Sequence, residues 1–234
     1  MRCKLLPDPI AFADALALER ELLDSVKDAS AGRCVALVWR TPKAIIVPRG
    51  LPSRDYYDKA SAAAQALGFT LHERDTGGDL TPQSEGVVNL SLAYRLDGKQ
   101  AAIADAYVAL TDPVLAFLKQ AYGINARTAS IPGAFCDGAY NVAIGDKKLA
   151  GTAQKWKLLG GEGDHRRVSV LGHIAIMASN ELAPALDALN AFYTASGSER
   201  RVIPERHITL TDVLGPARAE ASWVARDLAA SLSR

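Results

Sequence analysis

Strand-like segments follow one another with little more than a turn between them, and this order restricts the folds open to the chain. Short apolar runs, typical of buried strands, cover residues 34–39 (CVALVW) and 44–48 (AIIVP), and the turn-like RTPK separates them. Residues 141–156 form a second pair around Gly145-Asp146, a two-residue turn typical of a hairpin. Because parallel neighbours need long crossover connections, a doubly wound parallel sheet is disfavoured. We predict an α+β domain with a mixed, mostly antiparallel sheet and helices packed on it.

Hydrophobic periodicity places the remaining elements. We predict further strands over 69–74, 87–94 and 166–178, and helices over 11–28, 53–68, 101–123, 181–193 and 216–233. Ser53 is expected to cap the second of these helices and Gly68 to end it. Pro113 is expected to interrupt the third, with Asp112 capping a new helix from that point. No internal repeat or low-complexity linker divides the sequence, so residues 1–234 are expected to form one domain.

The composition disfavours several classes of protein. The 234 residues carry a net charge of +1, which gives no general reason to expect nucleic acid or an anionic membrane as a partner. No stretch approaches the roughly 20 apolar residues of a membrane span, and no long apolar leader opens the chain. The three cysteines are odd in number and far apart, without metal-ligand spacing, so neither a disulfide framework nor a metal site is expected. A reducing cytoplasm fits this pattern best.

One cysteine and one lysine lie close together in the segment CDGAYNVAIGDKKLAG, residues 136–151. A free cysteine is most often an inert buried thiol, but Cys136 would become a nucleophile if a nearby ammonium stabilised its thiolate. The hairpin could bring Lys148 to it. Lys147 and Lys148 alternate along the strand, so one of them could face a pocket while the other is solvated. The local sequence leaves both interpretations of the pair open.

Two other segments could contribute to a site, each with a plain structural alternative. In HERDTGGD, Gly77 and Gly78 end a strand, where backbone N–H groups could bind an anion and Arg74 could add charge. A lone Gly-Gly pair is more often a tight turn, and neither the Walker nor the Rossmann spacing is present. His173 lies within the apolar strand VLGHIAIMA, where a lone histidine is more often a core residue than a catalyst.

Taken together, these segments resemble, in chain order, the catalytic domain of the biotin/lipoate protein ligase family, on its lipoate side. The most specific match is NVAIGDKKLAGTAQKW, which is similar to the family's Lys-Ile-Ala/Ser-Gly-Ser/Thr-Ala-Gln signature. VWRTPKAIIVPRG, RDTGGD, VVNLSLAY and VLGHIAIMA resemble its other strands and its glycine-rich loop, and HITLTDVLG resembles the strand and turn that end its catalytic domain. Members of the family attach lipoyl or octanoyl chains, or biotin, to a lysine of a small carrier domain.

The resemblance implies a role for individual residues. Lys148 would hold the activated acyl carbonyl or phosphate. Cys136 matches the cysteine that carries an octanoyl thioester in an ATP-independent branch of the family. The implied substrate-binding residues are Arg74, Thr76, Gly77 and Gly78 in the loop and Gly151, Thr152, Ala153 and His173 on the strands.

Several positions depart from the family pattern. Gln83 lies near the place of a family histidine, and Ile174 replaces the glycine after the strand histidine. The loop GDLTPQSEG is polar and contains Pro82, unlike the usual alternating strand. Asp79 follows the glycine pair where the family has glycine or a basic residue. An acid there disfavours a nucleotide phosphate unless a cation such as Lys155 offsets it.

These features favour an enzyme, an octanoyl or lipoyl transferase that acts through a Cys136 thioester and needs no cofactor. The alternatives are an ATP-dependent lipoate ligase, which would use ATP and Mg²⁺, and a non-catalytic relative that binds an acyl group or a carrier. A biotin ligase is disfavoured, because the loop lacks that branch's basic character. A single catalytic domain without a C-terminal accessory domain is expected.

The resemblance also implies the partners. They are a lipoyl-carrier domain, either of an E2 subunit or of the glycine-cleavage H protein, and acyl carrier protein as a candidate donor. Such carriers are acidic as a rule in this family. A local basic patch could therefore steer them, the alternative being a solvated hairpin rim. The patch would consist of Lys147, Lys155, Lys157, Arg166 and Arg167.

Overall fold

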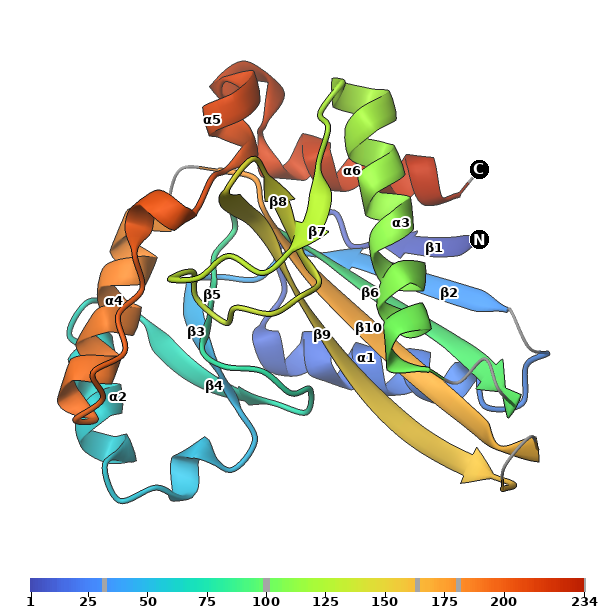
Figure 1. The fold of residues 1–234 in the computed structure, drawn as a ribbon, viewed down its shortest axis with the longest axis horizontal. Coiled ribbons are helices and arrows are strands. Elements are labelled where there is room, and N and C mark those ends of the chain that lie inside the picture. The colour runs from blue at the N-terminus through green and yellow to red at the C-terminus, as the bar shows by residue number, and fades with distance from the viewer. Residues whose placement is uncertain (31–32, 99–101, 163–164, 180–181, 234) are drawn as a thin grey trace.

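A seven-stranded sheet forms the centre of the computed structural model, which describes residues 1–30, 33–98, 102–162, 165–179 and 182–233 (Figure 1). Its spatial order is β1 (Arg2–Leu5), β2 (Cys34–Trp39), β6 (Val87–Asp97), β10 (Arg167–Met177), β9 (Lys147–Gly160), β8 (Asn141–Ile144) and β7 (Arg127–Ala129). β1 runs parallel to β2, and the other neighbouring pairs of this sheet are antiparallel. The predicted α+β fold with a mixed, mostly antiparallel sheet is confirmed.

A smaller sheet of three strands holds the glycine-rich loop. β3 (Ala44–Pro48) lies between β4 (Thr70–Arg74), to which it is parallel, and β5 (Thr81–Gln83), to which it is antiparallel. β5 falls in the polar segment that departs from the family pattern, and it contains Pro82. A proline is tolerated there because β5 is a short strand at the edge of its sheet.

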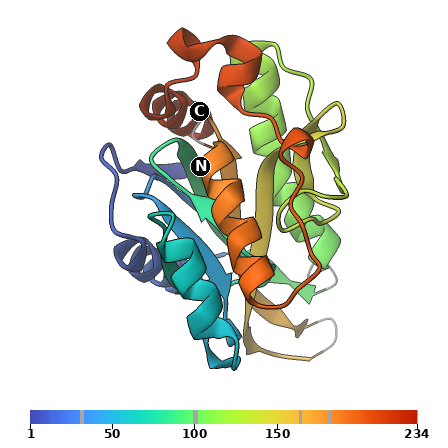
Figure 2. The ribbon, with the colours of Figure 1, turned by 90° about the vertical axis from the view of Figure 1, so that its left-hand side faces the viewer.

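Helices cover both faces of the large sheet (Figure 1). α3 (Ile103–Tyr122) and α6 (Ala221–Leu232) pack on one face over the largest apolar core, and α1 (Phe12–Ser25) packs on β2, β6 and β10. α2 (Tyr57–Gln65) and α4 (Leu182–Ala195) lie side by side against the small sheet (Figure 2). Shorter turns are η1 (Leu51–Ser53), η4 (Pro204–Arg206), α5 (Leu210–Leu214) and η5 (Pro216–Arg218). Within the described ranges, no helix is both long and apolar enough to cross a membrane.

Alternation along β6 separates the core from the face that carries the site. Leu90 and Leu92 pack into the core with α3. Ser91 and Ala93 point the other way, toward α1, where Ala93 packs against Leu23. Because successive side chains of a strand point to opposite faces, polar groups on β6 and β10 collect under α1 without disturbing the core.

α3 runs through Pro113 without a break, so the predicted interruption and the cap at Asp112 are wrong. Proline inside a helix removes one backbone hydrogen bond and costs about 3 kcal/mol. The helix continues because residues on both sides of the proline bury one apolar stripe against the sheet, namely Ala106, Leu110, Val114, Phe117 and Leu118.

The start of α2 also differs from the prediction. The helix begins at Tyr57 without a side-chain cap, and Ser53 lies in the preceding η1 turn. There the Ser53 hydroxyl donates to the carbonyl of Gly50 at 2.8 Å, so it stabilises the turn instead of the helix. Gly68 follows the helix with a φ of 81°, a left-handed conformation that favours glycine.

Two C-terminal segments contain shorter and more interrupted secondary structure than predicted. Residues 207–215 (HITLTDVLG) contribute one bridge, between Lys148 and His207, and then form α5 instead of a strand. The helix predicted over 216–233 is divided into η5 and α6. Glu220 accepts hydrogen bonds from the first backbone N–H groups of α6 and so fixes a new start there.

Candidate functional site

A narrow cleft lies between α1, the small sheet and strands β9 and β10. It is lined by Phe12, Leu16, Glu19, Ile46, Arg74, Thr76, Thr81, Gln83, Cys136, Gly151, Thr152, Ala153, His173 and Ala175. Most of the residues predicted for the site therefore meet here. Gly78 and Lys148 lie just behind the lining, against Cys136. Gly77 has open space around it, so packing does not require a glycine at that position.

Cys136 adopts a backbone conformation that few side chains tolerate. Its φ is 41°, and among the described non-glycine residues it alone has a positive φ. Neighbours hold the turn in place: the Phe135 N–H donates to Nε2 of His207 at 3.1 Å, and Lys148 Nζ donates to the carbonyls of Phe135 (2.6 Å) and Cys136 (3.1 Å). Strain of this kind persists where surrounding contacts over-determine it, and it is concentrated at functional sites.

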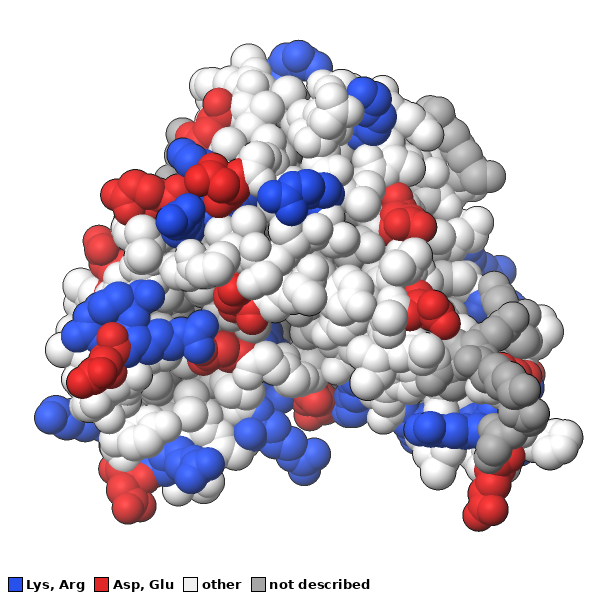
Figure 3. Space-filling model, viewed as in Figure 1, with Lys and Arg blue, Asp and Glu red and all other residues white. Residues whose placement is uncertain are grey.

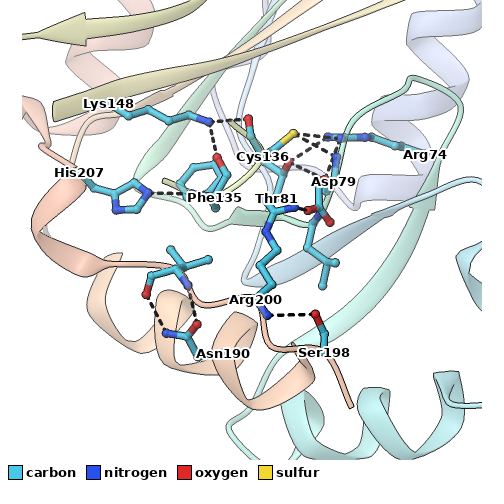
Figure 4. A network of polar contacts seen from close by, with 12 residues as sticks. Arg74, Asp79, Thr81, Phe135, Cys136, Lys148, Asn190, Ser198, Arg200 and His207 are labelled. Atoms are coloured by element: carbon cyan, nitrogen blue, oxygen red, sulfur yellow. Dashed lines mark hydrogen bonds and ion pairs between the residues drawn. The ribbon is translucent and has the colours of Figure 1, made fainter. Parts of the chain in front are cut away.

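The thiol of Cys136 receives two hydrogen bonds from the glycine-rich loop (Figure 4). The backbone N–H of Asp79 donates to Sγ at 3.1 Å, and Nη2 of Arg74 lies 3.8 Å from it. A Cβ at Gly78 would come within 2.9 Å of Sγ and 2.5 Å of Arg74 Nη2. Gly78 therefore lets the loop approach the thiol closely, and both donors are placed to stabilise negative charge on the sulfur.

Lys148 contacts the backbone of the cysteine loop. Its side chain is fully buried, and its Nζ lies 4.2 Å from the centroid of the Phe135 ring. Burial lowers the pKa of Lys148 to about 8, an effect that the nearby Cys136 and Asp137 partly offset. Gly151 leaves room for the ammonium, because a Cβ there would lie 3.2 Å from Nζ. The lysine thus anchors the loop and places positive charge beside the cysteine.

His207 is a site residue that the sequence analysis missed. Its ring stacks on Phe135 with centroids 5.0 Å apart, and its Nε2 accepts the Phe135 N–H. Burial lowers the pKa of His207 to about 4, so the ring is neutral near pH 7 and Nε2 can act as an acceptor. Nothing in the local sequence indicates this contact, because the partners lie 72 residues apart and only the folded chain joins them.

A buried polar network forms part of the cleft wall. Glu19 of α1 accepts from the Ser91 hydroxyl at 2.5 Å and contacts Nδ1 of His173 at 2.7 Å. Nε2 of His173 lies 3.0 Å from Oδ1 of Asn89, which is paired in turn with the amide of Gln83. His173 is therefore a hydrogen-bonded member of the cleft wall, and Gln83 supports it from β5.

Asp79 is balanced by a cation, but not by the one expected. The Asp79 carboxylate forms an ion pair with Arg200, from the segment after α4. Lys155 instead contacts Asp75 at 2.9 Å, and hydrogen bonds from Arg20 and Lys155 lower the pKa of Asp75 to about 2. The expectation that Lys155 would offset Asp79 is wrong, because Lys155 is held by the acid that precedes the glycine pair.

The chemistry of the cleft is that of a thiol site. It combines a thiol with two hydrogen-bond donors, a buried ammonium and small residues on β9 that leave space for a ligand. No group of histidine, cysteine or acidic side chains in the described ranges is arranged to hold a metal ion. This arrangement is suited to nucleophilic attack on a carbonyl, with donors close enough to stabilise negative charge.

Solved structures show the fold, which is that of the lipoate-protein ligases. A lipoate-protein ligase A bound with ATP matches with a TM-score of 0.67 and 19% identity, over 99% of this chain and 85% of that one. A putative lipoate protein ligase from T. acidophilum with bound lipoic acid gives a TM-score of 0.65 and 20% identity, over 99% and 86% of the two chains.

The sequence then defines the family. A family model described as the lipoyl protein ligase A/B catalytic domain matches residues 11–232, and the chain belongs to this family. An uncharacterized protein of Cupriavidus necator is 32% identical over 211 residues, which make up 87% of this chain and 82% of the relative.

Two curated relatives carry the name octanoyl-[GcvH]:protein N-octanoyltransferase. The one from Kyrpidia tusciae is 34% identical over 58% of this chain and 46% of its own length. The one from Geobacillus kaustophilus is 25% identical over 79% of this chain and 65% of its own length. The chain thus spans about half to two thirds of these two relatives.

Proposed function

We propose that this protein is an octanoyl or lipoyl transferase that carries the acyl group on Cys136 and delivers it to a lysine of a lipoyl-carrier domain. The observation that supports this most is the environment of the thiol. Cys136 opens onto the cleft from a strained turn, and the Asp79 N–H and the Arg74 guanidinium both point at its sulfur. A structural cysteine would need neither the strain nor the donors.

In the proposed first step, the Cys136 thiolate attacks the acyl carbonyl of the donor. A carbon–sulfur bond forms, the bond from the acyl carbon to the donor's nitrogen or sulfur breaks, and the departing group takes up a proton. In the second step, the neutral amine of the acceptor lysine attacks the thioester. A carbon–nitrogen bond forms, Cys136 leaves as the thiolate, and the proton lost by the amine balances the one taken up earlier. Neither step needs ATP.

Lys148 and Arg74 have separate tasks in this scheme. Lys148 holds the carbonyls of Phe135 and Cys136, so it keeps the sulfur aimed at the cleft. The Arg74 guanidinium and the Asp79 N–H lie beside the sulfur, where they stabilise the negative charge that appears there and on the acyl oxygen. The small side chains of Gly151 and Ala153 leave space for the acyl chain along β9.

The names of the relatives suggest the donor. Two curated relatives are named for transferring octanoyl from GcvH to protein, and we propose the same donor class here, with an E2 lipoyl domain as acceptor. Acyl carrier protein is the other donor to test. A title among the structural neighbours describes a bipartite lipoate protein ligase of Thermoplasma acidophilum and its E2 lipoyl domain, and this chain has that protein's fold with a TM-score of 0.61.

The test is the intact mass of the purified protein after mixing with octanoyl-GcvH, or with octanoyl-acyl carrier protein, in the absence of ATP. We expect a gain of one octanoyl group that hydroxylamine removes. The gain should be absent in Cys136→Ser and kept in Cys34→Ser, a matched control at a half-buried cysteine of β2. An adduct that survives in Cys136→Ser would contradict the proposal. Acyl attachment only with free lipoate and ATP would indicate a ligase instead.

A further inference from the structure

Arg200 reaches from the α4 side of the molecule to the loop that contacts the thiol (Figure 4). Its guanidinium forms the ion pair with the Asp79 carboxylate and lies 5.4 Å from the centroid of the Tyr193 ring. About two fifths of its side chain (39%) is exposed, compared with 24% for Asp79. Arg200 thus links the segment after α4 to the glycine-rich loop.

The backbone around Arg200 is held in place on both sides. Its own N–H donates to the Ser198 hydroxyl at 3.1 Å, and the Ser198 N–H donates to the carbonyl of Tyr193 at the end of α4. On the other side, the Asn190 side chain exchanges two hydrogen bonds with the backbone of Val202, at 2.8 and 3.0 Å. The guanidinium therefore projects from a fixed position, as a positioning group requires.

Asp79 has two contacts with opposite consequences for the thiol. Its backbone N–H donates to Sγ of Cys136, where it can stabilise negative charge on the sulfur. Its side-chain carboxylate is negatively charged, and this charge disfavours a second negative charge on the nearby sulfur. The carbonyl of Asp79 accepts a hydrogen bond from Arg74. The backbone N–H, the carbonyl and the carboxylate of Asp79 are therefore all held by partners.

We infer that Arg200 is a positioning residue for Cys136: it neutralises the Asp79 carboxylate and turns it away, so that Asp79 presents only its N–H to the sulfur. This inference rests on the proposed function for its purpose, since a thiolate at Cys136 matters only if the cysteine reacts. It also explains how the chain tolerates an acid directly after the glycine pair.

Other charged and titratable groups act on the same sulfur and stay constant in the test. They are Arg74 of the loop, Lys148 of β9, Tyr107 of α3 and Tyr193 of α4, and Asp137, next in the chain, acts on Lys148. Burial is the main reason that the pKa of Tyr107 and that of Tyr193 are raised, so both rings are uncharged near neutral pH.

The experiment measures the rate at which iodoacetamide alkylates Cys136 as a function of pH, followed by peptide mass so that Cys3 and Cys34 do not interfere. In Arg200→Gln the Asp79 carboxylate loses its ion-pair partner, and the midpoint of the rate profile should move up by about one pH unit. At a pH below the midpoint, alkylation should therefore be about tenfold slower than in the wild type. Arg200→Gln combined with Asp79→Asn should return the midpoint to the wild-type value.

Controls separate charge from simple damage. Arg200→Lys keeps the charge and should keep the wild-type midpoint. Arg201→Gln removes the neighbouring arginine, whose Nη1 donates to the backbone carbonyls of Ser198 and Arg200 and not to Asp79, and should leave the profile unchanged. The inference is overturned if Arg200→Gln leaves the midpoint in place, or if the double variant keeps the shifted midpoint. Alkylation needs no acyl donor, so it tests Arg200 separately from acyl transfer.

Discussion

At the scale of single residues, Lys148 shows how a sequence motif can predict a position without predicting its contacts. The motif indicates a lysine at the site, and its alternation with Lys147 indicates that one of the two faces inward. In the structure Lys148 is completely buried, and its ammonium donates hydrogen bonds to two backbone carbonyls. Those carbonyls belong to a turn whose shape no periodicity encodes, so this role could not be derived from the sequence.

The buried ammonium should make stability depend on pH. Burial lowers the pKa of Lys148 from 10.5 to about 8. Between these values the unfolded chain binds more protons than the folded one, so stability should rise with pH through this window. The gain should be about 3 kcal/mol.

Urea unfolding of the wild type and of Lys148→Met at pH 7 and at pH 10.5 measures this effect. The methionine has a similar length but no charge, so the variant should lack the rise and be less dependent on pH. Parallel pH dependence in the two proteins would show that Lys148 is not desolvated in the folded state.

At the scale of elements, α3 shows tertiary packing overriding a local signal. Pro113 is a strong helix breaker, yet the apolar stripe on both sides of it keeps the helix continuous. The longer strands were predictable because each shows alternation or a short apolar run, and 34–39 and 44–48 match β2 and β3 residue for residue. β1, β5 and β7 were not predicted, because a strand of three or four residues is too short to show a periodicity.

Pro113→Ala should therefore stabilise the protein. Alanine restores one backbone hydrogen bond in the middle of α3 and relieves the ring clash, while the unfolded chain becomes more flexible and offsets part of the gain. We expect the free energy of unfolding in urea to rise by about 1–2 kcal/mol. A lower value would mean that the proline ring contributes packing that alanine cannot replace. The change lies outside the cleft, so Cys136 alkylation serves as a control for an intact site.

At the scale of the whole molecule, the site is assembled from segments that are far apart in the sequence. Cys136, Lys148 and the glycine-rich loop could be recognised because each belongs to a motif. Arg200 and His207 could not, since a single arginine and a single histidine carry no signal until the chain folds and places them against Asp79 and Phe135.

The surface charge is mixed over the face shown in Figure 3, in keeping with the net charge of +1. Within the predicted basic patch, Lys155 pairs with Asp75 and Lys157 pairs with Asp24 at 2.7 Å. These two lysines are therefore partly neutralised. Recognition of an acidic carrier would therefore have to rely on cations other than these two lysines.

The measurement that tests the central claim most directly is a chase of the acylated protein. Octanoyl-protein is prepared from its donor, freed of that donor by gel filtration, and mixed with an apo E2 lipoyl domain without ATP. We predict that the octanoyl group leaves Cys136 and appears on the carrier lysine in equal amount, at a rate no slower than the complete reaction. An octanoyl group that stays on Cys136, or is released only as octanoate while the complete reaction proceeds, would contradict a Cys136 thioester as the intermediate.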